Sequence, residues 1–524
     1  MLKRSKFMKK QNLLALFGAV LLSSTIMSCG GNANKAYPSD YTIDTKGATI
    51  TFWNPFGAAI EASLAELVDQ FEQEYGITVN MESKGSYDNL RKAIVGAATS
   101  NKYPNVALAY PDHMAEYVNS DIILRLDSFF EHDNETTNSL KENVSLSIND
   151  FYKDYMIENQ LVEFKEDGTG YTLGVPFNKS TEVMVYNKTF FEWASSIDKD
   201  IKVPSTWDEL ETVGKKILAV MENAYGKVIG KDNKIYDKES DTPDQKCILN
   251  FENLKKNTNL KDETLNEYRF VPFSYDSQAN FFITLCRQWG GEYTTVSQDR
   301  KGHIVFDSDK VKEALNYMQK LYKEGIVGIP AVYGEAKYNS NPFKKIQTVM
   351  NIGSTAGADN ALPAGDKFTS ACAPTLYKDA NKKFVISQGT NLVMLDKGTD
   401  KERLASWQLI KYLSKNVNAE FSLSTGYFPS CEYAQNSDVY QDFINKNPNK
   451  LLPDAVQMQQ IAKINTNVYM KEETNWTKFV DTPFVGSARC RDAVSTIIPQ
   501  LFKDDMSATD VINKVYATLH DFAK

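Results

Sequence analysis

The spacing of hydrophobic residues between positions 48 and 109 changes in a regular order. Residues 48–53 are rich in β-branched and aromatic side chains and residues 77–81 alternate apolar and polar side chains, so both segments predict strands. Between them, apolar residues recur at helical spacing over 60–71, and a further buried strand is predicted at 106–109. The order strand, helix, strand predicts a parallel sheet with helical crossovers, and therefore an α/β fold.

Three positions at the carboxyl ends of these strands are candidate ligand contacts, because open parallel sheets bind ligands at that edge. Trp53 ends the first strand, Tyr87 closes the loop 84–87, and Asp112 lies in the turn after the third strand. Each also has a structural interpretation: core packing for Trp53, capping of a surface helix for Tyr87, and a plain turn for Asp112.

The segment 171–210 organises the middle of the chain. It opens with a short β-type run ending at Pro176, and residues 177–181 follow, which are too polar for a core strand. Residues 183–186 predict a second, buried strand. A helix begins near Phe190, and a further helix is predicted near 207–210, with acidic residues in its first turn. Ile122 to Phe130 is expected to form a strand and a short connection.

The segment resembles the extracellular solute-binding proteins of bacterial ABC importers. The resemblance lies in the order of its parts: strand, polar turn, strand, Asn187-Lys188, helix, and Pro204 to Leu210. The resemblance is to the family 1 members that bind carbohydrates, with the glycerol-3-phosphate-binding type nearest. The segment Thr425 to Pro429 matches a recognisable family motif at the expected distance. The resemblance implies an α/β, two-lobe periplasmic-binding-protein-like fold of type II, whose hinge is crossed several times.

The same resemblance implies the domain boundaries. We expect the first lobe to comprise residues 48–176 plus 392–430, and the second lobe 177–391 plus 431–524. Residues 222–268 are longer and more charged than family members predict, and their mixed signs indicate a solvated surface insertion.

A set of positions matches ligand contacts of the family or lies in its ligand-facing loops. We therefore expect ligand binding at Trp53, Tyr87, Asp112, Ser180, Thr181, Ser277, Asn280, Ser354, Thr355, Gly389, Tyr427 and Arg489. The glycerol-3-phosphate-binding relatives carry tryptophan at positions 277 and 280, and the motif around their ligand arginine is not reproduced near Arg489. A sugar or oligosaccharide is therefore the expected solute, with glycerol 3-phosphate or a glycerophosphodiester as the alternative.

The first residues predict export and a lipid anchor. Five basic residues precede an apolar run at 13–22, and Ser28-Cys29-Gly30 resembles a bacterial lipobox. We expect a signal peptide at 1–28, lipidation at Cys29 and a tether at 29–47, which place the protein in the cell envelope. Removal of the signal peptide takes away its five basic residues and lowers the net charge from −8 to −13, which argues against a nucleic-acid partner. The expected partners are the solute, the permease subunits of an ABC importer and, through the lipid alone, the membrane. We expect a monomer.

Other function classes have weaker support in the sequence. A secreted glycoside hydrolase would need two carboxylates at a specific separation, and 67 acidic residues make pairs uninformative. Residues 353–357 resemble a hydrolase elbow, but Thr355 stands where a serine nucleophile would be. Four scattered histidines and the absence of a Cys-x-x-Cys motif predict no metal site, and we expect no cofactor and no catalysis. A surface adhesin would leave the hinge motifs unexplained.

Overall fold

The computed structural model describes residues 38, 40, 42–133, 145–256, 259–297, 301–362 and 368–523. Cys29, the expected signal peptide and most of the expected tether lie outside the described residues. None of the helices in the described ranges is long and apolar enough to cross a membrane.

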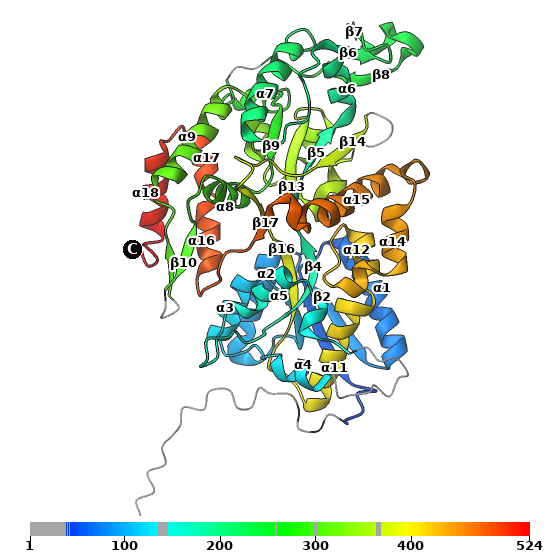
Figure 1. Ribbon diagram of the computed structural model, residues 1–524, viewed down its shortest axis with the longest axis vertical. Helices are drawn as coiled ribbons and strands as arrows, with labels where there is room; N and C mark the ends of the chain where they lie inside the picture. The colour runs from blue at the N-terminus through cyan, green and yellow to red at the C-terminus, as the bar shows by residue number, and fades with distance from the viewer. Residues whose placement is uncertain are drawn as a thin grey trace, which may run out of the picture. The chain divides into compact units, whose positions relative to one another are not determined.

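The first lobe is built on a five-stranded sheet, drawn in the lower half of Figure 1. Its strands, in spatial order, are β2 (Thr78–Ser83), β1 (Thr49–Asn54), β3 (Val106–Ala109), β16 (Gln388–Met394) and β4 (Val175–Ser180). β1 pairs in parallel with β2 and β3, as the sequence pattern predicts, whereas β16 runs antiparallel to β3 and β4. A strand from late in the chain therefore completes a sheet begun near residue 49.

Helices from both ends of the sequence cover this sheet. They are α1 (Ala58–Tyr75), α2 (Tyr87–Ala97), α3 (Pro111–Asn119), α4 (Asp127–Asp133), α5 (Lys153–Ile157), α11 (Asp400–Lys411), α12 (Asn418–Thr425), α13 (Glu432–Gln435) and α14 (Asp438–Asn445). The strand predicted between Ile122 and Phe130 is wrong. Only Ile123 forms a single bridge, to Leu395, and α4 begins at Asp127.

The second lobe is built on another five-stranded sheet. Its strands, in spatial order, are β12 (Val327–Gly328), β9 (Phe273–Tyr275), β13 (Met350–Ser354), β5 (Glu182–Asn187) and β14 (Ser370–Ala373). The helices of this lobe are α6 (Lys188–Ile197), α7 (Trp207–Met221), α8 (Gln278–Gln288), α9 (Asp309–Lys323), α10 (Ser340–Lys344), α15 (Pro453–Ile464), α16 (Ser487–Val494), α17 (Ile497–Phe502) and α18 (Ala508–Thr518). Figure 1 shows the C-terminal helices α16 to α18 beside α8 and α9.

The polar turn predicted at 177–181 is wrong, because most of this segment belongs to β4, and its residues are buried. A buried strand carries polar side chains only when they find partners. The Lys179 ammonium contacts the buried Glu158 carboxylate, and Asn178 accepts a hydrogen bond from the Thr390 backbone N–H at 3.3 Å. Thr181 alone separates β4 from β5, so the chain passes from one sheet to the other within one residue.

Two smaller parts of the chain lie differently from the sequence-based boundaries. Cys431, Ala434, Tyr440 and Ile444 pack in the hydrophobic core of the first lobe, although the sequence placed them in the second. Within the insertion 222–268, the strands β6 (Val228–Gly230), β7 (Ile235–Tyr236) and β8 (Cys247–Asn250) form a small sheet. Apolar side chains of the insertion, including that of Phe251, join the core of the second lobe, so the insertion is more than a solvated elaboration.

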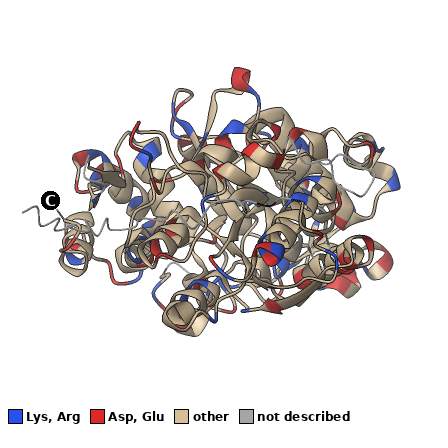
Figure 2. Ribbon diagram, turned by 90° about the horizontal axis from the view of Figure 1, so that it is seen from below, with Lys and Arg blue, Asp and Glu red and all other residues tan. Residues whose placement is uncertain are grey.

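Two further two-stranded sheets complete the described fold. β15 (Lys383–Ile386) pairs in parallel with β17 (Trp476–Phe479), directly before the chain enters β16. β10 (Thr294–Val296) pairs with β11 (Gly302–Ile304). Acidic and basic residues are interspersed along the ribbon in Figure 2, which agrees with the mixed charge of the sequence.

Candidate functional site

A cavity of about 600 Å³ lies between the two lobes, next to the strands that cross the hinge. Tyr87, Tyr110 and Tyr427 line it from the first lobe, and Asp276 and Asn280 line it from the second. Clefts of this size, with a few polar groups at fixed places, are typical of small-molecule sites.

Aromatic side chains form the first-lobe wall of this cavity. The hydroxyl oxygens of Tyr87 and Tyr427 lie 3.1 Å apart, and the Asn178 amide donates to the Tyr87 hydroxyl at 3.1 Å. The Tyr427 ring lies parallel to Phe421 with centroids 5.9 Å apart. Burial raises the pKa of both tyrosines, so both remain neutral hydroxyls. These contacts fix the two rings before any solute binds.

A buried carboxylate lies on the other side of the cavity. Glu182, at the start of β5, accepts a hydrogen bond from the Tyr275 hydroxyl and another from the Asn280 amide at 2.7 Å. The Asn280 side-chain oxygen in turn accepts from the Arg491 guanidinium. Burial raises the pKa of Glu182 to about 7, against the lowering effect of these donors and of Arg491. Glu182 thus holds Asn280, and Asn280 holds Arg491.

Asp276 anchors the loop before α10 to the second sheet. Its carboxylate accepts from the backbone N–H of Asn339 at 2.8 Å and from the Asn339 amide at 2.9 Å. Burial raises the pKa of Asp276 to about 6, and these hydrogen bonds offset part of the rise. A Cβ at Gly353 would lie 2.4 Å from the carboxylate, so glycine is required at this point of β13.

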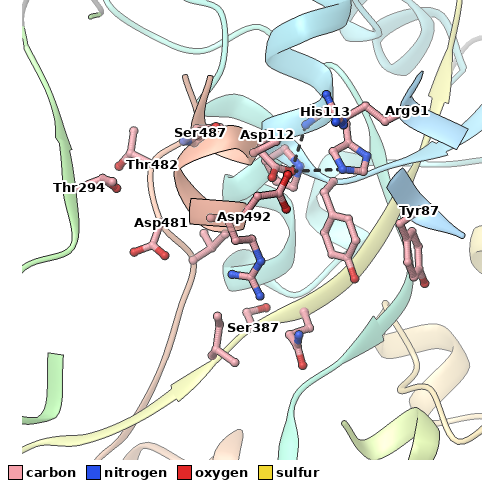
Figure 3. A pocket seen from close by; sticks show the side chains of 18 of the residues that line it. Tyr87, Arg91, Asp112, His113, Thr294, Ser387, Asp481, Thr482, Ser487 and Asp492 are labelled. Carbon is pink, nitrogen blue, oxygen red and sulfur yellow. Dashed lines mark hydrogen bonds and ion pairs between the residues drawn. The ribbon is translucent and has the colours of Figure 1, made fainter. Parts of the chain in front are cut away.

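A second cavity, of about 240 Å³, adjoins the first at Tyr87, Tyr110 and Gln388. Figure 3 shows its polar lining, which includes Asp112, Ser387 and Asp481. Its buried polar atoms without a hydrogen-bond partner among the described residues are His113 Nδ1, Tyr293 Oη, Ser387 Oγ and Gln388 Oε1. Buried polar groups in proteins are normally paired, so these atoms are available to a bound polar molecule.

The structure brings most of the sequence-predicted site residues to these cavities. The lining residues among them are Tyr87, Asp112, Ser180, Ser277, Asn280, Ser354 and Tyr427. Gly389 lies beside them in β16, with φ of 91° and its Cα packed against Asn178, so a Cβ would meet the Asn178 carbonyl at 1.9 Å.

Four predicted residues lie differently. Thr181 and Thr355 are buried between the strands, and the Thr181 hydroxyl donates to the Ile386 carbonyl at 2.7 Å. The Lys84 ammonium covers the Trp53 ring at 3.6 Å, and Trp53 lines neither cavity. Arg489 is half-exposed and pairs with Asp521, whereas Arg491, two residues later on α16, lines the second cavity.

The sequence interpretation did not single out Glu182, Gln388 or Arg491. Arg491 could have been found indirectly. The expected ligand arginine, Arg489, lies on the same short helix but on its opposite face. No sequence pattern pointed to Glu182 or Gln388 apart from their places beside the predicted hinge crossings. Polar residues at such places resemble ordinary turn residues.

A family model, described as bacterial extracellular solute-binding protein, matches residues 66–449. The chain belongs to this family. The membership predicted from the ordered motifs is therefore confirmed, and so is the two-lobe fold. Proteins of this family bind small molecules.

Three solved structures of solute-binding proteins share this fold. UgpB of Mycobacterium tuberculosis, in complex with glycerophosphocholine, superposes with a TM-score of 0.64 at 15% identity, covering 91% of this chain and 98% of that one. The GacH receptor of Streptomyces glaucescens, solved unliganded and with acarbose, gives 0.62 at 16% identity over 91% and 98%. Lmo0181 of Listeria monocytogenes, in complex with cycloalternan, gives 0.61 at 15% identity over 90% and 99%.

Curated relatives match a shorter part of the sequence. The sn-glycerol-3-phosphate-binding periplasmic protein UgpB of Yersinia enterocolitica is 27% identical over 171 residues, which cover 32% of this chain and 35% of that protein. The match thus spans about a third of the length of these curated relatives.

Proposed function

We propose that this solute-binding protein is the receptor of an ABC importer and captures a sugar or oligosaccharide between its lobes. The cavity lined by Tyr87 and Tyr427 on one side and by Asn280 on the other carries this proposal. Closure of the lobes around the solute would present it to the permease subunits. The matched structures bound to acarbose and to cycloalternan support a carbohydrate as the solute class.

The charges that line the second cavity favour a neutral solute over an anion. The second cavity is lined by four aspartates and two arginines. Of these, Arg91 pairs with Asp88 and Glu116, so its charge is already compensated. Arg491 is linked through Asn280 to the buried Glu182. A phosphate would find little uncompensated positive charge here, whereas hydroxyl groups would find many acceptors.

Glycerol 3-phosphate or a glycerophosphodiester remains the second candidate. Arg491 favours it, because an arginine in a cleft suits bidentate binding of phosphate. Lys337 and Lys344, which line the larger cavity, favour an anion as well. The curated relatives named for glycerol 3-phosphate support the same solute.

We also infer that the protein carries out no catalysis, although two carboxylates with raised pKa, Glu182 and Asp276, lie in a cleft suited to sugars. Fixed donors already bind these carboxylates: Tyr275 and Asn280 bond the two oxygens of Glu182, and Asn339 bonds one oxygen of Asp276. A hydrolase acid would instead have to reach the glycosidic oxygen. The Thr355 side chain at the elbow-like turn is buried, and His520 pairs with Asp521.

The motif at Cys29 and the basic, apolar start of the sequence support export and lipid anchoring. We propose that the protein is held at the cell envelope by a lipid on Cys29 and acts there as a monomer.

Thermal melting against a panel of solutes tests the proposed function. The panel contains mono- to tetrasaccharides of several linkages, glycerol 3-phosphate and glycerophosphodiesters. Binding to the folded state stabilises it by about 2.7 kcal/mol at a hundredfold excess over Kd, so a bound solute raises the melting temperature. We expect a saccharide to give the largest rise, and no release of product from chromogenic glycosides.

Tyr427→Phe is the matched variant, because it removes the hydroxyl next to Tyr87 and keeps the ring on Phe421. The saccharide-induced rise should shrink while the melting temperature without solute changes little. A rise for glycerophosphate compounds and none for saccharides would replace the proposed solute by the second candidate.

A further inference from the structure

Tyr338 is an exposed aromatic side chain at the second-lobe rim of the larger cavity. About half of its surface is exposed (55%), and it lines the cavity together with Tyr427 from the opposite lobe. Single exposed aromatic residues are common on protein surfaces, so exposure alone assigns no role.

Buried hydrogen bonds hold the backbone next to Tyr338 in place. Asn339 is completely buried and donates to the Asp276 carboxylate through both its backbone N–H and its side-chain amide. The same amide donates to the Asn351 side-chain oxygen at 3.0 Å, which ties the loop to β13. Burying the Asp276 carboxylate is unfavourable, as the rise in its pKa shows. This anchoring fixes where the backbone presents Tyr338.

The opposite wall of the cavity presents a second fixed aromatic surface. Tyr427 packs on Phe421, and its hydroxyl lies against that of Tyr87. Between the two walls, the second lobe contributes the polar side chains of Ser277, Gln278 and Asn341. The Lys337 ammonium lies over one face of the Tyr338 ring, 5.1 Å from its centroid. The exposed part of this ring and the Tyr427 ring, with amide and hydroxyl groups between them, suit a molecule that has apolar C–H faces and a polar rim. Pyranose rings have this character.

We propose that Tyr338 forms an outer subsite that stacks on a further sugar ring of an oligosaccharide bound in the cleft. This proposal rests on the proposed function, in which the solute is a saccharide. It adds that the protein binds more than one sugar unit, and that Tyr338 sets its preference for the longer solute.

Calorimetric titration of the purified full-length protein with mono-, di- and trisaccharides of the same linkage tests this subsite. We expect Tyr338→Ala to bind the di- or trisaccharide about tenfold more weakly, a loss typical of an aromatic contact residue, and to bind the monosaccharide within about twofold of the original. Tyr338→Phe keeps the ring and should bind all of them nearly as the original protein does. Tyr433, 60% exposed on α13 and outside both cavities, provides the control variant Tyr433→Ala.

The outcomes separate the subsite from the proposed function. Equal weakening of all saccharides in Tyr338→Ala would mean that Tyr338 acts on lobe closure, and would overturn the subsite. Unchanged binding of every saccharide would overturn it as well and leave the saccharide receptor standing. If the original protein binds no saccharide, the proposed solute and the subsite fall together.

Discussion

Glu182 is almost completely buried at the edge of the larger cavity. Its two oxygens are bonded by Tyr275 and Asn280, and Arg491 is linked to it through Asn280. The other titratable groups that face it are Asp276 and Tyr469, whose hydroxyl donates to the Glu182 carbonyl at 3.0 Å. Arg491 of α16 is thus connected to β5 through Asn280 and Glu182, and the described residues show no other arginine that connects these two elements. The charge state of Glu182 therefore affects this connection.

Glu182→Gln should reduce the dependence of stability on pH. Because the folded-state pKa of Glu182 is raised from 4.5 to about 7, the protonated form stabilises the fold below pH 4.5, and this stabilisation is lost as the pH rises through 7. The loss is on the order of 3 kcal/mol at most. The melting temperature of the original protein should therefore fall between pH 5 and pH 8, and that of Glu182→Gln should fall less.

Asp276 remains in both proteins, so its titration contributes to the fall in both. Identical falls in melting temperature for the two proteins would show that Glu182 has the same pKa folded and unfolded.

At the scale of elements, the hinge strand β4 depends on a buried ion pair. Lys179 and Glu158 are almost completely inaccessible, the Lys179 ammonium also donates to the Gly389 carbonyl at 3.2 Å, and the Asn391 amide donates to Glu158 at 2.9 Å. Burial lowers the pKa of Lys179, and the Glu158 charge opposes this shift. The pair joins the helical segment before β4 to both strands at the crossing.

Glu158→Gln should destabilise the protein by about 3–5 kcal/mol, because it leaves the Lys179 charge buried without a counter-charge. The double variant Glu158→Gln with Lys179→Met removes both charges and should recover much of this loss. Midpoints of urea unfolding measure both effects. Losses that simply add in the double variant would show that the two charges do not stabilise each other.

Some of these elements could be predicted from the sequence and others could not. β1, α1 and β2 could be predicted because each has one apolar face at the period of its structure. β4 could not, since its buried polar residues find partners outside their own segment, in Glu158, Thr390 and Tyr87. Cys431 to Ile444 were assigned to the wrong core for a similar reason: α13 and α14 pack on α12, whose apolar side chains belong to the first-lobe core.

The same reasoning applies to the site. Tyr87 and Tyr427 could be expected in the cleft, since both belong to motifs with a recognisable spacing. Arg489 and Arg491 are two residues apart on α16, and such residues face opposite sides of a helix. Only the packing of α16 against α8 and α3 decides which arginine faces the cavity.

At the scale of the whole molecule, the anchor on Cys29 would keep the two lobes near the membrane. Cys29→Ala should release the exported protein into the soluble fraction and prevent its labelling by a radioactive fatty acid, because one residue carries the lipid. Cell fractionation and labelling measure both effects. Cys247→Ala is the control, since Cys247 is a partly exposed cysteine in β8 with no disulfide. Unchanged fractionation of Cys29→Ala would contradict lipid attachment.

The late arrival of β16 in the first sheet has a consequence for biogenesis. β1 and β3 emerge from the ribosome early, but the strand that joins β3 to β4 spans residues 388–394 and the core helices of that lobe extend to Asn445. The second lobe likewise needs α18, which ends at Thr518. Neither lobe can finish folding until most of the chain has been synthesised. Such an order of folding suits a chain that is threaded through a membrane channel while still unfolded, and it makes premature folding in the cytoplasm slow.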